Sequence, residues 1–92
     1  AKIRVTNNGK VQGVFFRQSA SREAKKLNIS GWIKNLPDGS VLSEAIGPEN
    51  LLSDFIFWCK KGPQRAEVTN TTVEWLNTEE DIPSIKQFDI ID

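Results

Sequence analysis

The chain has 92 residues, with 12 Lys and Arg balanced by 12 Asp and Glu and no histidine. We expect one domain over residues 1–92, which at this size buries about 60–65% of its unfolded surface. The zero net charge argues against a general nucleic-acid binder or a membrane-surface protein, because both need an excess of basic residues. No apolar run is long enough to span a membrane, and the first residues lack the features of a signal peptide.

The missing histidine and the lone Cys59 narrow the chemistry further. A zinc site would have to use one thiol and carboxylates, which is a poor set of ligands. No Ser-His or Cys-His pair can form, and no side chain has an ordinary pKa near neutrality. A single cysteine cannot form an internal disulfide, which favours the reducing cytoplasm. Any catalysis must therefore depend on positioning and electrostatics.

The chain begins with the pattern of a strand, a loop and a helix. Residues 2–7 alternate apolar and polar, with Ile3 and Val5 on one face, as in a half-buried strand. A helix is expected from about Arg17 to Asn28. Its narrow buried stripe consists of small and apolar residues that let it lie close to a sheet: Ala20, Ala24 and Leu27.

A hairpin follows. Residues 29–36 favour a strand, and Pro37-Asp38-Gly39 has the residue types of a tight turn. On the returning strand, 41–47, the side chains of Leu42 and Ile46 point away from the helices. We expect them to form an exposed apolar patch, which permits weak self-association of an otherwise monomeric protein, unless the stems of basic side chains cover it.

A second helix is bounded by Gly47-Pro48-Glu49 at its start and Gly62-Pro63 at its end. Its buried stripe has helical spacing: Leu51, Leu52, Phe55, Ile56 and Cys59. For Cys59, a small buried apolar side chain is a better interpretation than a reactive thiol.

In the next strand, Ala66 and Val68 have the opposite parity to Val73 and Trp75, which predicts a β-bulge within Thr69 to Thr72. The inward positions of a last strand are Phe88 and Ile90. The order strand, helix, strand, strand, helix, strand, strand predicts a two-layer α+β sandwich, with right-handed crossovers that place both helices on one face.

Residues 10–17, Lys-Val-Gln-Gly-Val-Phe-Phe-Arg, are the stretch that most suggests a function. They join the first strand to the first helix, where unpaired N–H groups and the helix dipole favour an anion. Gly9 and Gly13 let the loop curl into a nest of inward N–H groups. Arg17 adds a donor fork that matches phosphate. The spacing is not that of a P-loop, and a glycine loop with a solvated Arg is the ordinary alternative.

Two longer blocks give this stretch a context. They are residues 9–17 and residues 31–41, Gly-Trp-Ile-Lys-Asn-Leu-Pro-Asp-Gly-Ser-Val, and Gly47-Pro48, Gly62-Pro63 and Ala66-x-Val68 follow in order. Together they resemble the acylphosphatase family over nearly the full length. That family hydrolyses the mixed anhydride of a carboxylate and phosphate. The resemblance implies a ferredoxin-like fold: two helices on one face of an antiparallel sheet, βαββαβ with a final short strand.

The resemblance also implies roles for particular residues. The phosphate of a small acyl phosphate would be held by Arg17 and by backbone N–H groups of the loop Val11, Gln12, Gly13, Val14, Phe15 and Phe16. Asn35 would orient the attacking water, although Asn before Pro-Asp-Gly is also ordinary turn chemistry. No metal or cofactor is implied, since a carboxylate leaving group, whose acid has a pKa of about 4, needs no general acid. Inorganic phosphate should inhibit as the product.

Three alternatives remain open. A carbamoyl-phosphate-handling domain of a much larger maturation factor has the same fold, but a complete last strand favours a stand-alone enzyme. An RNA-recognition module would need aromatic residues on the open sheet face, where none is expected among Lys2, Arg4, Thr6, Leu42, Glu44 and Ile46. A small-ligand regulatory module is not distinguished by fold alone.

Overall fold

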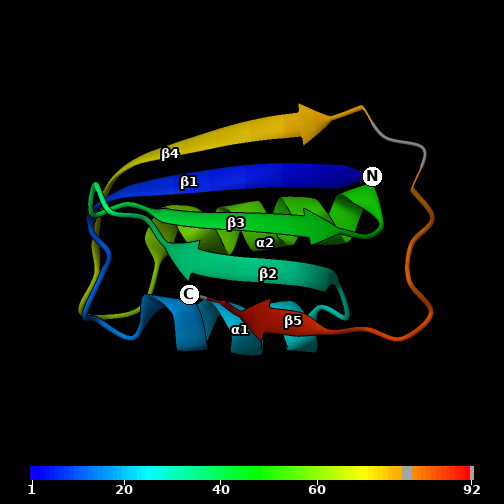
Figure 1. Cartoon of the computed structure of the whole chain (residues 1–92), viewed down its shortest axis with the longest axis horizontal. Coiled ribbons are helices and arrows are strands. Elements are labelled where there is room, and N and C mark those ends of the chain that lie inside the picture. The colour runs from blue at the N-terminus through cyan, green and yellow to red at the C-terminus, as the bar shows by residue number, and fades with distance from the viewer. Residues whose placement is uncertain (78–79, 92) are drawn as a thin grey trace.

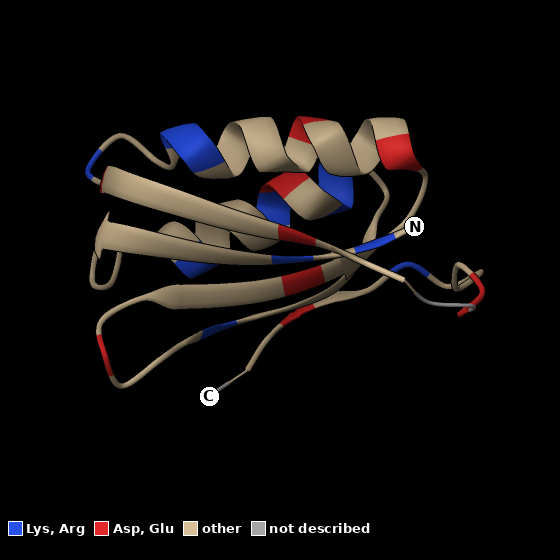
Figure 2. Cartoon of the chain, turned by 90° about the horizontal axis from the view of Figure 1, so that it is seen from above, with Lys and Arg blue, Asp and Glu red and all other residues tan. Residues whose placement is uncertain are grey.

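A computed structural model of the chain describes residues 1–77 and 80–91 (Figure 1). The seven elements follow the predicted order: β1 (Lys2–Lys10), α1 (Phe16–Lys26), β2 (Ser30–Asn35), β3 (Val41–Ile46), α2 (Glu49–Lys61), β4 (Glu67–Leu76) and β5 (Phe88–Ile90). Both helices cover one face of the sheet and leave the other face without a helix, as Figure 2 shows from the side. The predicted two-layer α+β sandwich is confirmed.

The sheet has the strand order β4-β1-β3-β2-β5. The first four strands pair antiparallel, as expected, but β5 pairs parallel with β2, so the whole sheet is mixed. Figure 1 shows the reason: the chain leaves β4, crosses that end of the sheet and enters β5 from the same end. β5 must then run opposite to β4 and in the direction of β2. The expectation of a purely antiparallel sheet therefore holds for β1 to β4 only.

The core lies between the sheet and the two helices. Ile3 and Val5 of β1 are fully buried, as their alternation predicts. Helix α2 contributes Phe55, whose ring packs 5.5 Å from that of Phe88 in β5. Helix α1 contributes Phe16, which meets Trp58 of α2 edge to face at 5.4 Å. The Phe16 contact holds the first residue of α1 against α2, and this is the end of the helix that faces the candidate site.

The predicted β-bulge is present. Asn8 of β1 lies opposite Asn70 and Gly9 lies opposite Val68, so Thr69 is the extra residue of β4. Gly9 has a φ of +116°, and a Cβ there would lie 2.1 Å from the carbonyl oxygen of Glu67. Gly9 thus serves close strand pairing at the bulge. The expectation that it curls the following loop was wrong, because β1 continues through Lys10.

Two residues expected to face the core are only partly covered. Trp75 is 49% exposed and Ile90 is 42% exposed. Each lies on an edge strand, β4 or β5, which has a neighbour on one side only. Correct parity directs a side chain toward the helix layer, but at an edge this does not suffice to bury it.

The expected apolar patch on the open sheet face is not exposed. Ile46 is 7% exposed and Leu42 is half-buried. Ile46 lines a hollow together with Lys2, Glu80 and Pro83, so the segment that contains Glu80 and Pro83 lies against this end of the sheet. The Lys2 ammonium lies 2.8 Å from the Glu80 carboxylate and 3.5 Å from that of Glu44. Of the two residues expected to form the patch, only Leu42 keeps part of its surface exposed.

Candidate active site

The loop between β1 and α1 has an unusual backbone. Gly13 has a φ of +74°, and Phe15, the residue before the helix, is left-handed with a φ of 62° and a ψ of 25°. A residue other than glycine rarely adopts this conformation, which costs about 1–3 kcal/mol and tends to occur at functional sites. Within the described part of the chain, no side chain caps α1 and no acidic residue lies in its first turn. The start of α1 therefore offers N–H groups and partial positive charge to an anion.

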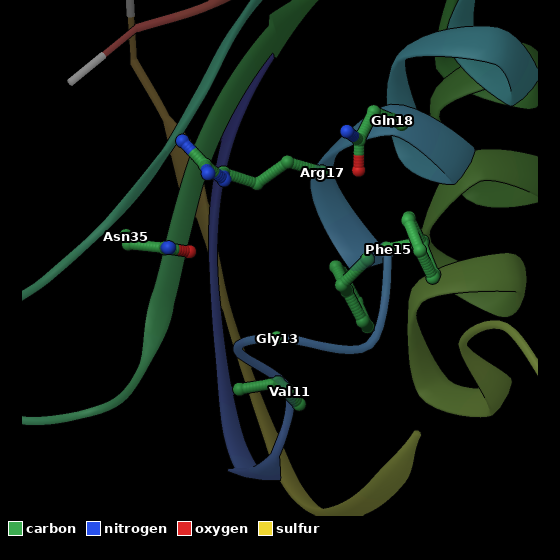
Figure 3. Close-up of a pocket in the computed structure, with 7 residues that line it drawn as sticks. Val11, Gly13, Phe15, Arg17, Gln18 and Asn35 are labelled. Atoms are coloured by element: carbon green, nitrogen blue, oxygen red, sulfur yellow. The ribbon is translucent and has the colours of Figure 1, made fainter. Parts of the chain in front are cut away.

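A pocket of about 210 Å³ opens beside this junction. Its walls come from the loop, from the first turn of α1 and from the last residue of β2. Figure 3 shows the Arg17 guanidinium and the Asn35 amide extending from opposite sides toward the same space. The full lining is Val11, Gly13, Phe15, Phe16, Arg17, Gln18 and Asn35.

Asn35 is placed by the turn that follows it. It pairs with Val41 at the end of the β2–β3 ladder, and the backbone N–H of Leu36 donates to the Ser40 carbonyl at 2.9 Å. Within residues 1–77 and 80–91, the Asn35 side-chain oxygen Oδ1 is buried and has no hydrogen-bond partner. A buried acceptor without a partner is uncommon in folded proteins. The fold therefore does not use this oxygen in its own hydrogen bonding.

The same turn is held by Asp38. Its carboxylate accepts hydrogen bonds from the Ser40 backbone N–H at 2.9 Å and from the Ser40 hydroxyl at 2.6 Å. These bonds stabilise the charged carboxylate, so they lower the pKa of Asp38 below its usual value. The carboxylate that caps this turn is thus charged at neutral pH.

Six of the eight residues predicted for the site line this pocket: Val11, Gly13, Phe15, Phe16, Arg17 and Asn35. The other two, Gln12 and Val14, do not line it. Val14 is 5% exposed and belongs to the core, and the Gln12 side chain is bonded to the β2–β3 turn. Any contribution of these two residues to phosphate binding must come from their backbone N–H groups.

Gln18 lines the pocket but was not predicted. Its position in the first turn of α1, directly after Arg17, is the signal that could have identified it, because side chains there flank an anion bound at the helix start.

The described residues contain no group of three or more His, Cys, Asp and Glu that could hold a metal ion. They also contain no helix with the length and apolar character that a membrane span requires. Cys59 is buried on α2, and this burial raises the pKa of its thiol. It is thus a packing residue, as expected.

Comparison with known proteins now identifies the family. The family profile described as acylphosphatase matches residues 3–90. An acylphosphatase of Anaeromyxobacter dehalogenans is 41% identical over 81 residues, which cover 88% of this chain and 87% of that protein. The chain belongs to the acylphosphatase family.

Solved structures agree. The crystal structure of acylphosphatase from Bacillus subtilis superposes with a TM-score of 0.87 and 36% identity, covering 99% of this chain and 98% of that one. The ferredoxin-like α+β fold expected of an acylphosphatase is thereby confirmed. Full-length HypF, in its phosphate- and nucleotide-bound form, has a TM-score of 0.81 at 23% identity, with 12% of that chain covered. That likeness concerns the fold alone.

Proposed function

We propose that this member of the acylphosphatase family hydrolyses the carboxyl–phosphate anhydride of small acyl phosphates. The products are a carboxylate and inorganic phosphate. The observation that carries the proposal is one pocket that joins an uncapped helix start, the Arg17 guanidinium and the Asn35 amide. Anion binding, charge neutralisation and water placement are the three tasks that phosphoryl transfer requires.

The phosphoryl group lies at the start of α1 in this proposal. Backbone N–H groups of residues 11–16 donate to its oxygens, and the dipole of α1 favours its negative charge. Arg17 adds two or more donors in a fixed plane, which suits the equatorial oxygens of the transition state. Gly13 supports this arrangement because its positive φ lets the loop turn around the anion.

The attacking water lies against Asn35. The Asn35 carboxamide can donate an N–H to the water oxygen, and it orients the water in this way without acting as a base. The water oxygen forms a bond to phosphorus while the bond from phosphorus to the acyl oxygen breaks. The electron pair leaves with the carboxylate, and a phosphoryl oxygen takes the proton of the water. No histidine and no general acid is needed, since a carboxylic acid has a pKa of about 4.

The proposal includes three further features. The reaction needs no metal ion, because the N–H groups and Arg17 neutralise the phosphoryl charge. Inorganic phosphate competes with the substrate, because it fits the same N–H groups. The protein acts as a monomer in the cytoplasm, which agrees with the burial of Ile46 on the open face and with its lone, buried Cys59.

The test is release of phosphate from acetyl phosphate in the presence of a strong chelator. We expect the same kcat with and without chelator, and we expect added phosphate to raise KM while kcat stays constant. Loss of activity in chelator, restored by a divalent cation, would contradict metal independence. Absence of phosphate release from acetyl phosphate and from other simple acyl phosphates would contradict the proposed activity itself.

A further inference from the structure

Gln12 belongs to the phosphate loop by sequence, but its side chain leaves the pocket. The amide nitrogen Nε2 donates to the carbonyl oxygen of Leu36 at 2.8 Å and to that of Ser40 at 2.9 Å. A carboxamide has two N–H donors, so these two bonds use its whole donor capacity. One side chain therefore connects the β1–α1 loop to a turn more than twenty residues further along the chain.

The two acceptors are the residues that close the β2–β3 turn. The Leu36 N–H donates to the Ser40 carbonyl at 2.9 Å, and the Gly39 N–H donates to the Leu36 carbonyl at 3.1 Å. Leu36 directly follows Asn35, the last residue of β2. The Gln12 amide thus holds both ends of the turn at the point where Asn35 enters the pocket.

The pocket has two walls that come from separate segments of the chain. Arg17 and the loop form one wall, and Asn35 at the end of β2 forms the other. In-line attack requires a fixed distance between the water on Asn35 and the phosphoryl group on the first wall. A displacement of about 1 Å can cost 10²-fold in rate. A bond from the loop itself to the turn beside Asn35 fixes that distance directly.

We propose that Gln12 is a positioning residue that fixes Asn35 relative to the phosphate loop; this inference rests on the proposed function. Its backbone N–H belongs to one wall and its side chain holds the other. It acts through Asn35 and touches neither the substrate nor the water with its side chain.

The main variant is Gln12→Met, which keeps the length of the side chain and the backbone N–H but removes both donors. We expect kcat to fall by about 10- to 100-fold. The inhibition constant of inorganic phosphate should change by less than about threefold, since Arg17 and the loop amides remain. Gln12→Asn keeps a polar amide, but its side chain is one methylene too short to reach the Leu36 and Ser40 carbonyls. It should therefore also lower kcat with little change in the phosphate inhibition constant.

A double-mutant cycle separates positioning from general stability. If Gln12 acts through Asn35, Gln12→Met should lower kcat by less than about threefold in an Asn35→Ala background. Ser21→Ala is the matched control: the Ser21 hydroxyl donates to the Phe88 carbonyl at 2.9 Å, a buried side-chain-to-backbone bond one turn along α1 from Arg17. This control should lower stability with kcat unchanged in both backgrounds.

The nuclear magnetic resonance signals of the Asn35 side-chain amide give a readout that does not depend on activity. They should shift in Gln12→Met and Gln12→Asn and stay in place in Ser21→Ala. Equal loss of kcat in both Asn35 backgrounds, or unchanged Asn35 signals, would overturn the role of Gln12. A wild-type protein that hydrolyses no acyl phosphate would instead overturn the proposed function, and the amide signals would still decide whether Gln12 holds Asn35.

Discussion

Arg17 lies in the first turn of α1 and lines the pocket where the helix dipole already favours an anion. In the proposed reaction it contacts the phosphoryl group in both the ground state and the transition state. Arg17→Ala should therefore weaken phosphate binding and also lower kcat. Loss of one preorganised donor to developing charge costs about 3–4 kcal/mol, and a guanidinium offers more than one donor.

Arg17→Lys tests whether charge alone is enough. An ammonium is a point charge and cannot reproduce the planar fork, so this variant should recover little activity. Arg22→Ala, which removes an exposed cation from the same helix, is the control and should leave kcat and the phosphate inhibition constant unchanged. Full activity of Arg17→Lys would show that geometry at this position is unimportant.

At the residue scale, the sequence predicted the pocket residues that are tied to backbone motifs. Arg17 and Asn35 were expected together from two sequence blocks, and both line the pocket. The direction of the Gln12 side chain could not be predicted, because its acceptors are carbonyl groups of a turn that becomes its neighbour only after folding. Gln18 was missed for a related reason: an exposed helical glutamine has no distinguishing pattern of its own.

At the scale of single elements, the β2–β3 turn depends on one charged cap. Hydrogen bonds from Ser40 lower the pKa of Asp38 in the folded state, so the unfolded chain binds the proton more tightly. The contribution of these bonds to the free energy of unfolding is fully present above the ordinary Asp pKa of 3.8. It is lost as the pH falls through the lower pKa that Asp38 has in the folded state. The stability difference between wild type and Asp38→Ala should thus be constant from neutral pH to about pH 4 and narrow below it.

Urea unfolding at a series of pH values measures this difference. Asp38→Asn is the matched control, because its amide oxygen can still accept from Ser40 but carries no charge, so its stability should lose this acid dependence. A difference between wild type and Asp38→Ala that widens on acidification would contradict the assignment of Asp38 as the turn cap.

The elements themselves were predictable to different degrees. The parity change between Val68 and Val73 predicted the bulge, because a strand can present both to the helix layer only with an extra residue. The exposure of Trp75 and Ile90 was not predictable from parity. Alternation says which face of the sheet a side chain takes, but not whether its strand lies at an edge.

At the scale of the whole molecule, the order of elements and the two-layer packing followed from the pattern of helices and strands. The parallel pairing of β5 with β2 did not, because it depends on the path of the chain across the end of the sheet. The same path explains why Ile46 is buried at one end of the open face. Lys2 of β1 meets Glu80, which follows β4 in the chain, and Pro83 lies beside Ile46. Contacts between such distant segments leave no periodic trace in a sequence.

The fold brings Arg17 and Asn35 to one pocket from separate elements, and the central claim is that they divide the work between phosphate and water. The most direct measurement is kcat together with the phosphate inhibition constant for Asn35→Ala. We expect kcat to fall by about 10²- to 10³-fold, the cost of one preorganised donor, while the inhibition constant stays near its wild-type value. Loss of phosphate binding with turnover retained would contradict this division of roles.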